Sequence, residues 1–217
     1  SLLAGFTIVT ASIIAMTKDN LKARLAYSTI SQLSYIILAA MLGVATGVLA
    51  GSLHIAMHAF AKITLFFCAG AILVAAHKTK VSELNGIGKM MPITMIAFLL
   101  AALSIVGLPP LGGSWSKWLL LQATMDAHNM VLLMVLLISS LLNLFYWVEI
   151  PIRGFFAKPV DPEYNNGIKE APKFSLVAIL ITTTGCLALF FLVNPAWSLV
   201  EKVLPWINNT YLITQKM

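Results

Sequence analysis

Charged side chains are scarce in this sequence. Asp, Glu, Lys and Arg make up 10% of the 217 residues, whereas hydrophobic residues make up 59%. The mean hydropathy of +0.91 is far from the balance of a soluble domain, in which about a quarter of the residues are charged. Its long apolar runs predict an all-α integral membrane protein.

Cysteine is also scarce, and motifs for phosphate binding or hydrolysis are missing. Cys68 and Cys186 lie within apolar runs and have no spacing partner, so neither a disulfide framework nor a metal knuckle is predicted. No phosphate-cradling loop and no nucleophile with a placed base is present. We therefore expect no cofactor, no bound metal and no nucleic-acid partner, and we favour a transporter over an enzyme.

Apolar segments of nearly membrane-spanning length follow one another along the chain. A crossing helix needs about 20 mostly apolar residues at 1.5 Å each. The fourth segment is broken by GLPPLGGS into two half-helices. Asp19 or Asn20 is the expected N-cap of the second segment, at 21–42. About six crossings are predicted, at 2–17, 21–42, 48–76, 92–106 with 114–127, 130–156 and 174–193.

Basic residues are distributed unevenly between the links. If the six helices alternate, the two sides differ strongly in lysine and arginine content, and the positive-inside rule puts the rich side in the cytoplasm. Both ends of the chain are then non-cytoplasmic. The poor side has only Lys202 and Lys216, and two lysines, Lys62 and Lys117, fall inside the membrane. The rich side receives Lys18, Lys22, Arg24, Lys78, Lys80, Lys89, Arg153, Lys158, Lys169 and Lys173.

The stretch HIAMHAFAKITLF carries three titratable residues at every fourth position. His54, His58 and Lys62 form one stripe on the third helix, with roughly 6 Å of rise between neighbours. A hydrogen-bonded packing role is the alternative for either histidine alone. A lysine at membrane depth costs at least ~2.5 kcal/mol, which favours a functional role for the stripe. A zinc site is disfavoured, because no third ligand lies nearby and a cation follows one turn later.

The stretch GLPPLGGS is the second signal. Its prolines remove backbone donors and its glycines make a break easy, and broken membrane helices commonly line ion or substrate pathways. Ser114 is the expected N-cap of the resumed half-helix, and Lys117 is expected in its first turn. A proton relay suits that lysine, and a snorkelling interfacial lysine is the alternative. The residues that define the break are Gly107, Pro109, Pro110, Gly112 and Gly113.

Polar side chains on two other helices extend this pattern. Ser28, Gln32 and Tyr35 share a face of the second helix, and Asn143 belongs to a weaker polar stripe on the fifth. These residues are candidates to line a hydrated path, although small polar residues also serve as packing contacts between membrane helices. Lys22 is either an ordinary positive-inside residue or the start of the path, and the residues alone favour the first.

Several stretches together resemble the antiporter-like subunit family, which is shared by the membrane arm of respiratory complex I and the Mrp-type cation/proton antiporters. They are KDNLKARLAYSTISQLSY, HIAMHAFAKITLFFCAGAI, VSELNGIG and GLPPLGGSWSKWLLL. SSLLN with its aromatic cluster, RGFF and SKW look closest to the Mrp D subunit. Two positions depart from the family pattern. Ser114 stands where an aromatic residue is usual, and Glu149 stands where proline is frequent and is expected to pair with Arg153.

The resemblance implies a fold and a site. Residues 1–156 correspond to the second five-helix inverted repeat, 157–172 to a cytoplasmic linker, 173–194 to the last transmembrane helix and 195–217 to an interfacial segment. The first repeat is absent from this sequence, so it is either a split subunit or a fragment. The implied proton relay consists of Lys22, His54, His58, Lys62 and Lys117.

The function predicted on these grounds is proton translocation in a multisubunit monovalent cation/proton antiporter. A proton-pumping subunit of an NADH:quinone oxidoreductase or membrane-bound hydrogenase is the first alternative, and a structural half-subunit without transport is the second. Expected partners are other membrane subunits, including a chain with the missing N-terminal repeat, the lipid bilayer, protons and a monovalent cation such as Na⁺. The expected location is a bacterial inner membrane, with the mitochondrial inner membrane as the alternative.

Overall fold

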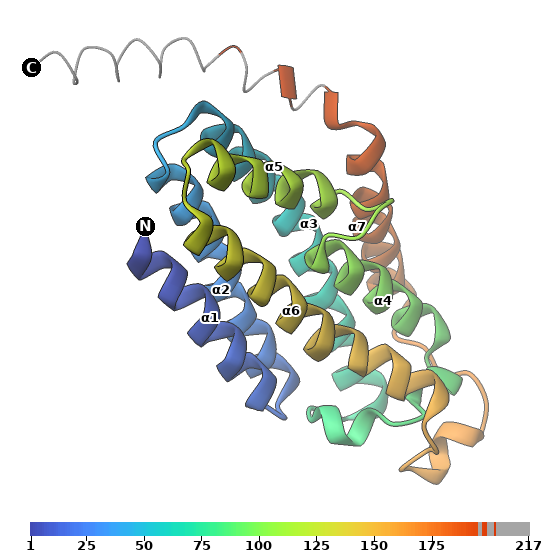
Figure 1. The fold of residues 1–217 in the computed structure, drawn as a ribbon. Coiled ribbons are helices and arrows are strands. Elements are labelled where there is room, and N and C mark those ends of the chain that lie inside the picture. Colours follow the sequence, from blue (N-terminus) through green and yellow to red (C-terminus); the bar gives the residue numbers. More distant parts are fainter. Residues whose placement is uncertain (195–196, 199–201, 203–217) are drawn as a thin grey trace, which may run out of the picture.

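The computed structural model describes residues 1–194, 197–198 and 202. Within them it contains seven α-helices and no β-strand, as predicted (Figure 1). The predicted interfacial segment 195–217 lies almost wholly outside the described residues. The helices are α1 (Leu2–Thr17), α2 (Leu21–Met41), α3 (Ala45–Ala76), α4 (Pro92–Val106), α5 (Gly113–Asp126), α6 (Met130–Phe156) and α7 (Lys173–Phe191), and short 3₁₀ turns are η1 (Val81–Leu84), η2 (Ile87–Lys89) and η3 (Pro162–Asn165).

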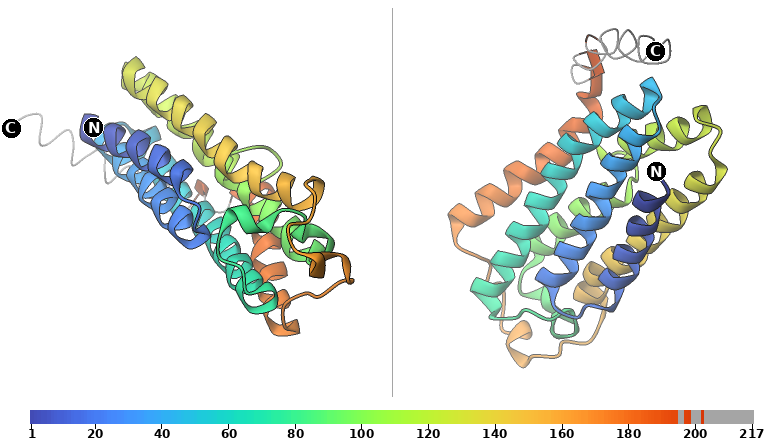
Figure 2. Two further views of the ribbon diagram at one scale, coloured as in Figure 1. Left: turned by 90° about the horizontal axis from the view of Figure 1, so that it is seen from below. Right: turned by 90° about the vertical axis from the view of Figure 1, so that its left-hand side faces the viewer.

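Helix α3 is the centre of the bundle. It packs against α2, α4, α5 and α7, while α1 packs against α2 and α6 (Figure 2). Helices α4 and α5 run in different directions on either side of the segment 107–112 (Figure 1). The titratable stripe predicted on α3 therefore lies on the helix that contacts most of the others.

The polarity of the bundle is inverted relative to a soluble protein. Gln32 and Asn143 are fully buried, whereas large apolar side chains such as Ile37 and Phe145 are exposed. In water, an apolar surface of this extent would drive aggregation or association. A lipid environment explains both features, and the chain is an all-α integral membrane protein.

Three described helices, α3, α6 and α7, are long and apolar enough to cross a membrane, and α1 and α4 are shorter apolar helices. Helix α2 has comparable length but carries the buried polar stripe, which lowers its hydropathy. The prediction of six crossings therefore agrees with the helix positions, while the number of crossings itself stays a prediction.

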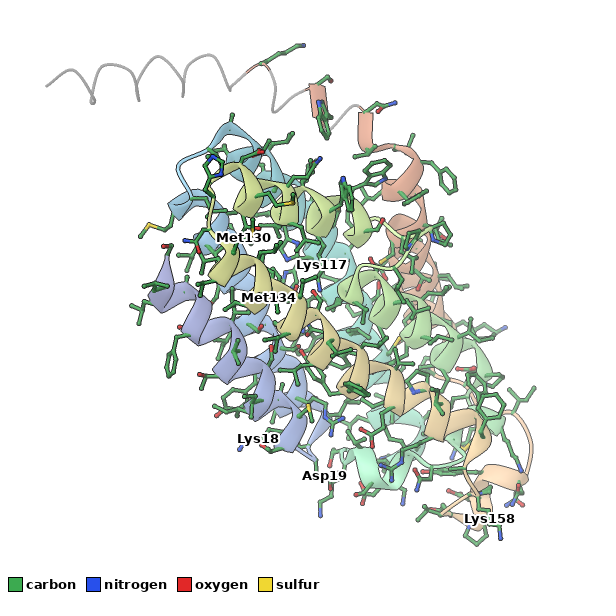
Figure 3. All side chains as sticks on the ribbon, in the orientation of Figure 1. Lys18, Asp19, Lys117, Met130, Met134 and Lys158 are labelled. Atoms are coloured by element: carbon green, nitrogen blue, oxygen red, sulfur yellow. The ribbon has the colours of Figure 1, made fainter. Side chains whose placement is uncertain are left out.

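Loops at one end of the bundle are fastened by carboxylates. Lys18, Asp19 and Lys158 lie at that end, and Met130 lies at the other (Figure 3). The Asp19 carboxylate accepts hydrogen bonds from the backbone N–H of Ser82 at 2.9 Å and from its hydroxyl at 2.8 Å. The backbone donor is the main reason that the pKa of Asp19 lies below its usual value.

Helix ends follow the expected capping chemistry in part. The side chain of Asn20 accepts a hydrogen bond from the backbone N–H of Ala23 at 3.0 Å, so Asn20 rather than Asp19 caps α2. Glu170, far along the chain, caps α4 by accepting hydrogen bonds from the N–H groups of Ile93 at 2.6 Å and Thr94 at 3.3 Å. The link before α7 is thereby fastened to the start of α4.

Candidate functional site

The predicted stripe on α3 is buried and its rings are stacked. His54, His58 and Lys62 have relative exposures of 3%, 9% and 5%. The imidazole rings of His54 and His58 lie 5.8 Å apart at an interplanar angle of 19°. Spacing by one helical turn thus brings these side chains together, as the sequence predicted.

Lys62 points toward α2 and α6. Its Nζ donates to the carbonyl oxygen of Leu25 at 3.1 Å and to the hydroxyl of Ser28. The same atom lies 5.0 Å from the ring centre of Trp147, on α6. In the described part of the chain, the amine therefore contacts a carbonyl, a hydroxyl and an aromatic face, three groups to which an ammonium group can bind.

His54 connects three helices. Its Nδ1 lies 2.9 Å from the hydroxyl oxygen of Ser116 on α5, and its Nε2 lies 3.2 Å from Oε1 of Gln32 on α2. Tyr35 stacks on the imidazole at a centroid distance of 5.7 Å. Gln32 and Tyr35, both predicted to line a path, therefore contact the α3 stripe directly.

Lys117 is buried where α5 meets α6. Its Nζ donates to the hydroxyl of Ser140 at 3.2 Å and lies 5.3 Å from the ring centre of Tyr35. His54 stacks on the same ring, so Tyr35 contacts both the α3 stripe and Lys117. Figure 3 shows Lys117 between the two ends of the bundle.

Glycines allow the close packing around Lys117. Gly107 ends α4 with φ +92°, and a Cβ there would lie 2.8 Å from Cδ of Lys117. At Gly113, the first residue of α5, a Cβ would lie 1.8 Å from the carbonyl oxygen of Ser104. Only glycine fits at Gly113, and at Gly107 any other residue would strain the backbone and displace the stem of Lys117. Pro109 and Pro110 are exposed in the segment between them.

Helix α7 supplies hydrogen-bond acceptors to this region. The backbone N–H of Gly112 donates to the carbonyl of Cys186 at 2.9 Å, and the indole N–H of Trp115 donates to the carbonyl of Phe190 at 3.0 Å. The prediction that Ser114 caps α5 was wrong. Helix α5 already begins at Gly113 with Gly112 as its N-cap, so Ser114 lies inside the first turn, where its hydroxyl donates to the carbonyl of Leu111.

Two predicted residues stand apart from this core. Lys22 is exposed at the start of α2, on the apolar outer stripe that continues through Ile30 and Ile37. Asn143 is buried and accepts a hydrogen bond from the hydroxyl of Tyr146. Lys22 therefore makes no contact with the buried lysines among the described interactions, whereas Asn143 lies near the Trp147 ring that faces Lys62.

Several buried polar atoms have no hydrogen-bond partner among the described residues. They belong to side chains of the polar core, on α2, α3 and α6. Atoms of this kind at membrane depth are satisfied by water or remain costly. They are Nε2 of Gln32, Nε2 of His58, Nδ2 of Asn143 and Nε1 of Trp147.

Sequence reasoning missed two features near the site. The hydroxyl of Ser12 lies 2.9 Å from those of Ser31 and Ser139, so one serine cluster joins α1, α2 and α6. Ser12 has no polar residue three or four positions away in α1, so it gave no periodic signal. The buried guanidinium of Arg24, which bonds to Glu149 at 3.4 Å, was also missed because the sequence paired Glu149 with Arg153 alone.

The predicted ion pair between Glu149 and Arg153 is present at 2.7 Å. Within the described residues, no group of three or more His, Cys, Asp or Glu side chains could hold a metal ion. The titratable side chains gathered around α3 are lysines and histidines, packed with hydroxyl groups in an otherwise apolar bundle.

Known proteins resemble this chain over most of its length. NADH-quinone oxidoreductase subunit N of Desulforudis audaxviator is 35% identical over 94% of this chain and 43% of its own length. The structure of an archaeal membrane-bound sulfane sulfur reductase matches with a TM-score of 0.78 and 27% identity, over 86% of this chain and 30% of the matched one.

A third similarity concerns the fold alone. The structure of the Mrp complex from a Dietzia species matches with a TM-score of 0.83 and 21% identity, over 94% of this chain and 46% of the matched one. The chain thus spans less than half the length of the relatives it matches. A family model described as NADH:quinone oxidoreductase/Mrp antiporter, TM, matches residues 1–143. The chain therefore belongs to the NADH:quinone oxidoreductase/Mrp antiporter transmembrane family.

Proposed function

We propose that this chain is the C-terminal half of a proton-translocating membrane subunit. Protons pass along a hydrated path between Lys62 and Lys117, through His58 and His54, with Tyr35 beside the path. The observation that supports the proposal is the continuous row of buried titratable side chains. Histidine titrates in the physiological range and is suited to hand protons between neighbours.

Distances along the row are compatible with water-mediated transfer. The rings of His58 and His54 lie 5.8 Å apart, those of His54 and Tyr35 lie 5.7 Å apart, and Nζ of Lys117 lies 5.3 Å from the Tyr35 ring centre. Transfer needs a bridging water wherever the donor and acceptor atoms themselves lie more than about 3.5 Å apart. The unpartnered Nε2 atoms of His58 and Gln32 lie on this row and can bind such waters.

Lys22 belongs to the proposal only through the family resemblance. It is exposed on the outer face of α2, so any transfer between it and Lys62 requires water or a neighbouring subunit. Ser28, which accepts from Lys62, lies on the opposite, buried face of the same helix. Asn143 contributes as a polar wall residue beside Trp147. The break between α4 and α5 gives Lys117 its place at the end of the row.

The proposal is tested by proton flux in vesicles that contain the whole complex. We expect Lys117→Met and His58→Leu to reduce flux at least tenfold, because each removes one site of the row. Lys173→Met is the matched control, since Lys173 is exposed at the start of α7. Wild-type flux in both row variants would reject the relay and support a structural half-subunit.

We further propose that the assembly is a monovalent cation/proton antiporter in a bacterial inner membrane, with Na⁺ as the candidate cation. The resemblance of SSLLN, RGFF and SKW to Mrp D subunits supports this assignment. A complex driven by quinone reduction is the second candidate, supported by the 35% identity to an NADH-quinone oxidoreductase subunit. Co-purification with iron–sulfur subunits would select the second. Intact-mass analysis would identify a partner with the first repeat.

A further inference from the structure

A cleft opens on the side of the bundle where α4 gives way to α5. Its volume is about 480 Å³, within the range of about 300–1,000 Å³ that is common for small-ligand sites. Trp118 is 59% exposed at this surface, and Leu137 is 45% exposed. The apolar part of the wall is formed by Val106, Trp115, Trp118, Leu121, Leu137 and Phe190.

Lys117 is the only charged residue in the wall of this cleft, all of whose residues lie in the described part of the chain. Ser114 and Ser140 add hydroxyls, and Ser140 accepts a hydrogen bond from the lysine amine at 3.2 Å. The cleft therefore combines a lysine amine and hydroxyl groups with an apolar wall. An anionic head with a flexible apolar tail fits both parts.

We propose that this cleft binds a long-chain carboxylic acid from the bilayer, with its carboxyl group at Lys117 and Ser140 and its tail along the tryptophans. A phosphate diester fits less well, because its permanent charge would have to enter an apolar cleft to reach the buried Lys117, which lies between the ends of the bundle (Figure 3). A carboxylic acid can approach in its neutral form.

The charge remains balanced when the acid binds. The acid O–H gives its proton to the amine form of Lys117, which leaves a carboxylate beside an ammonium group with no net change in charge. A charge-assisted hydrogen bond then joins the two groups. If Lys117 relays protons as proposed above, the bound acid holds that proton and blocks the end of the row.

Tryptophan fluorescence provides a direct test in the purified complex reconstituted into vesicles. The probe is 9,10-dibromostearic acid, whose bromines quench nearby indoles, and its methyl ester is the matched control. We expect part of the quenching to saturate, and we expect the acid to reach saturation at a mole fraction in the bilayer at least about tenfold lower than the ester. A charged hydrogen bond is worth about 1.5–3 kcal/mol, and 1.4 kcal/mol is tenfold.

Two variants, with a third as control, test whether the saturable quenching arises in the cleft. Lys117→Met should abolish the acid preference, and Trp118→Phe should reduce the amplitude, while Lys173→Met should behave as the wild type. Equal quenching by acid and ester in the wild type would overturn the proposal without any variant. An unchanged preference in Lys117→Met would also overturn it. Neither measurement uses transport, so binding and the proton relay succeed or fail separately.

Discussion

Replacing Gly107 with alanine tests how the end of α4 positions Lys117. The substitution places an L-residue at φ +92°, which costs about 1–2 kcal/mol. It also places a Cβ 2.8 Å from Cδ of Lys117, so the lysine stem has to retreat to an ordinary contact of 3.4 Å or more. Forcing extra volume into a packed site adds about 1–3 kcal/mol.

Two other glycines separate these effects. Gly43 has φ +68° and no atom within 4 Å of a built Cβ, so Gly43→Ala carries the backbone cost alone. Gly70 is helical with equally open space, so Gly70→Ala is neutral or stabilises by up to about 1 kcal/mol. A loss of about 1 kcal/mol lowers the melting temperature by roughly 2–4 °C. We therefore expect Gly70→Ala to melt at the highest temperature, Gly43→Ala at a lower one and Gly107→Ala at the lowest.

Proton flux gives the decisive comparison. The amine of Lys117 lies 3.2 Å from the Ser140 hydroxyl, and a small displacement takes it beyond the hydrogen-bond limit of about 3.5 Å. Gly107→Ala should therefore slow flux severalfold at a temperature where all three variants are folded, and the other two should not. If Gly107→Ala has the same melting temperature as Gly43→Ala and transports protons at the wild-type rate, the contact between Gly107 and Lys117 is unimportant.

Other interactions near the ends of the bundle lead to further predictions. Glu149→Gln should destabilise the protein by about 1 kcal/mol, because the buried Arg24 loses its carboxylate at 3.4 Å; an unchanged melting temperature would contradict this. The pKa of Asp19 is lowered chiefly by the backbone N–H of Ser82, so its contribution is complete above the unfolded value of about 3.9 and lost as pH falls through the folded one. Asp19→Asn should melt lower than the wild type at pH 7, with the difference vanishing in acid; a constant difference would refute the linkage. Glu170→Ala removes the cap of α4 and should cost about 1–2 kcal/mol, seen as faster hydrogen exchange in its first turn, and unaltered exchange there would exclude the capping role.

Much of the fold could be predicted because apolar run length and helix punctuation are local signals. The expected segments 2–17, 92–106 and 130–156 match α1, α4 and α6 at both ends. The error at Ser114 has a physical reason. The prediction assumed that the helix resumes after Ser114, but α5 already begins at Gly113, which has no Cβ to clash with the carbonyl of Ser104, so Ser114 lies inside the first turn.

The site was predictable along one helix and less so between helices. Periodicity alone placed His54, His58 and Lys62 on one face, because spacing by four residues determines it. The contacts of Tyr35 with His54 and Lys117, and of Trp147 with Lys62, depend on how α2, α5 and α6 pack around α3. Such relations join residues far apart in sequence, and no local pattern encodes them.

The hydrogen bonds from Gly112 and Trp115 to α7 have a mechanical consequence. The main-chain oxygens of Cys186 and Phe190 hold the turn that precedes Lys117. In hydrocarbon, a donor that leaves its acceptor finds no water to replace it. Sliding α7 past this turn would therefore break both bonds at high cost or drag the turn along, so a pull on the last helix is transmitted to the lysine.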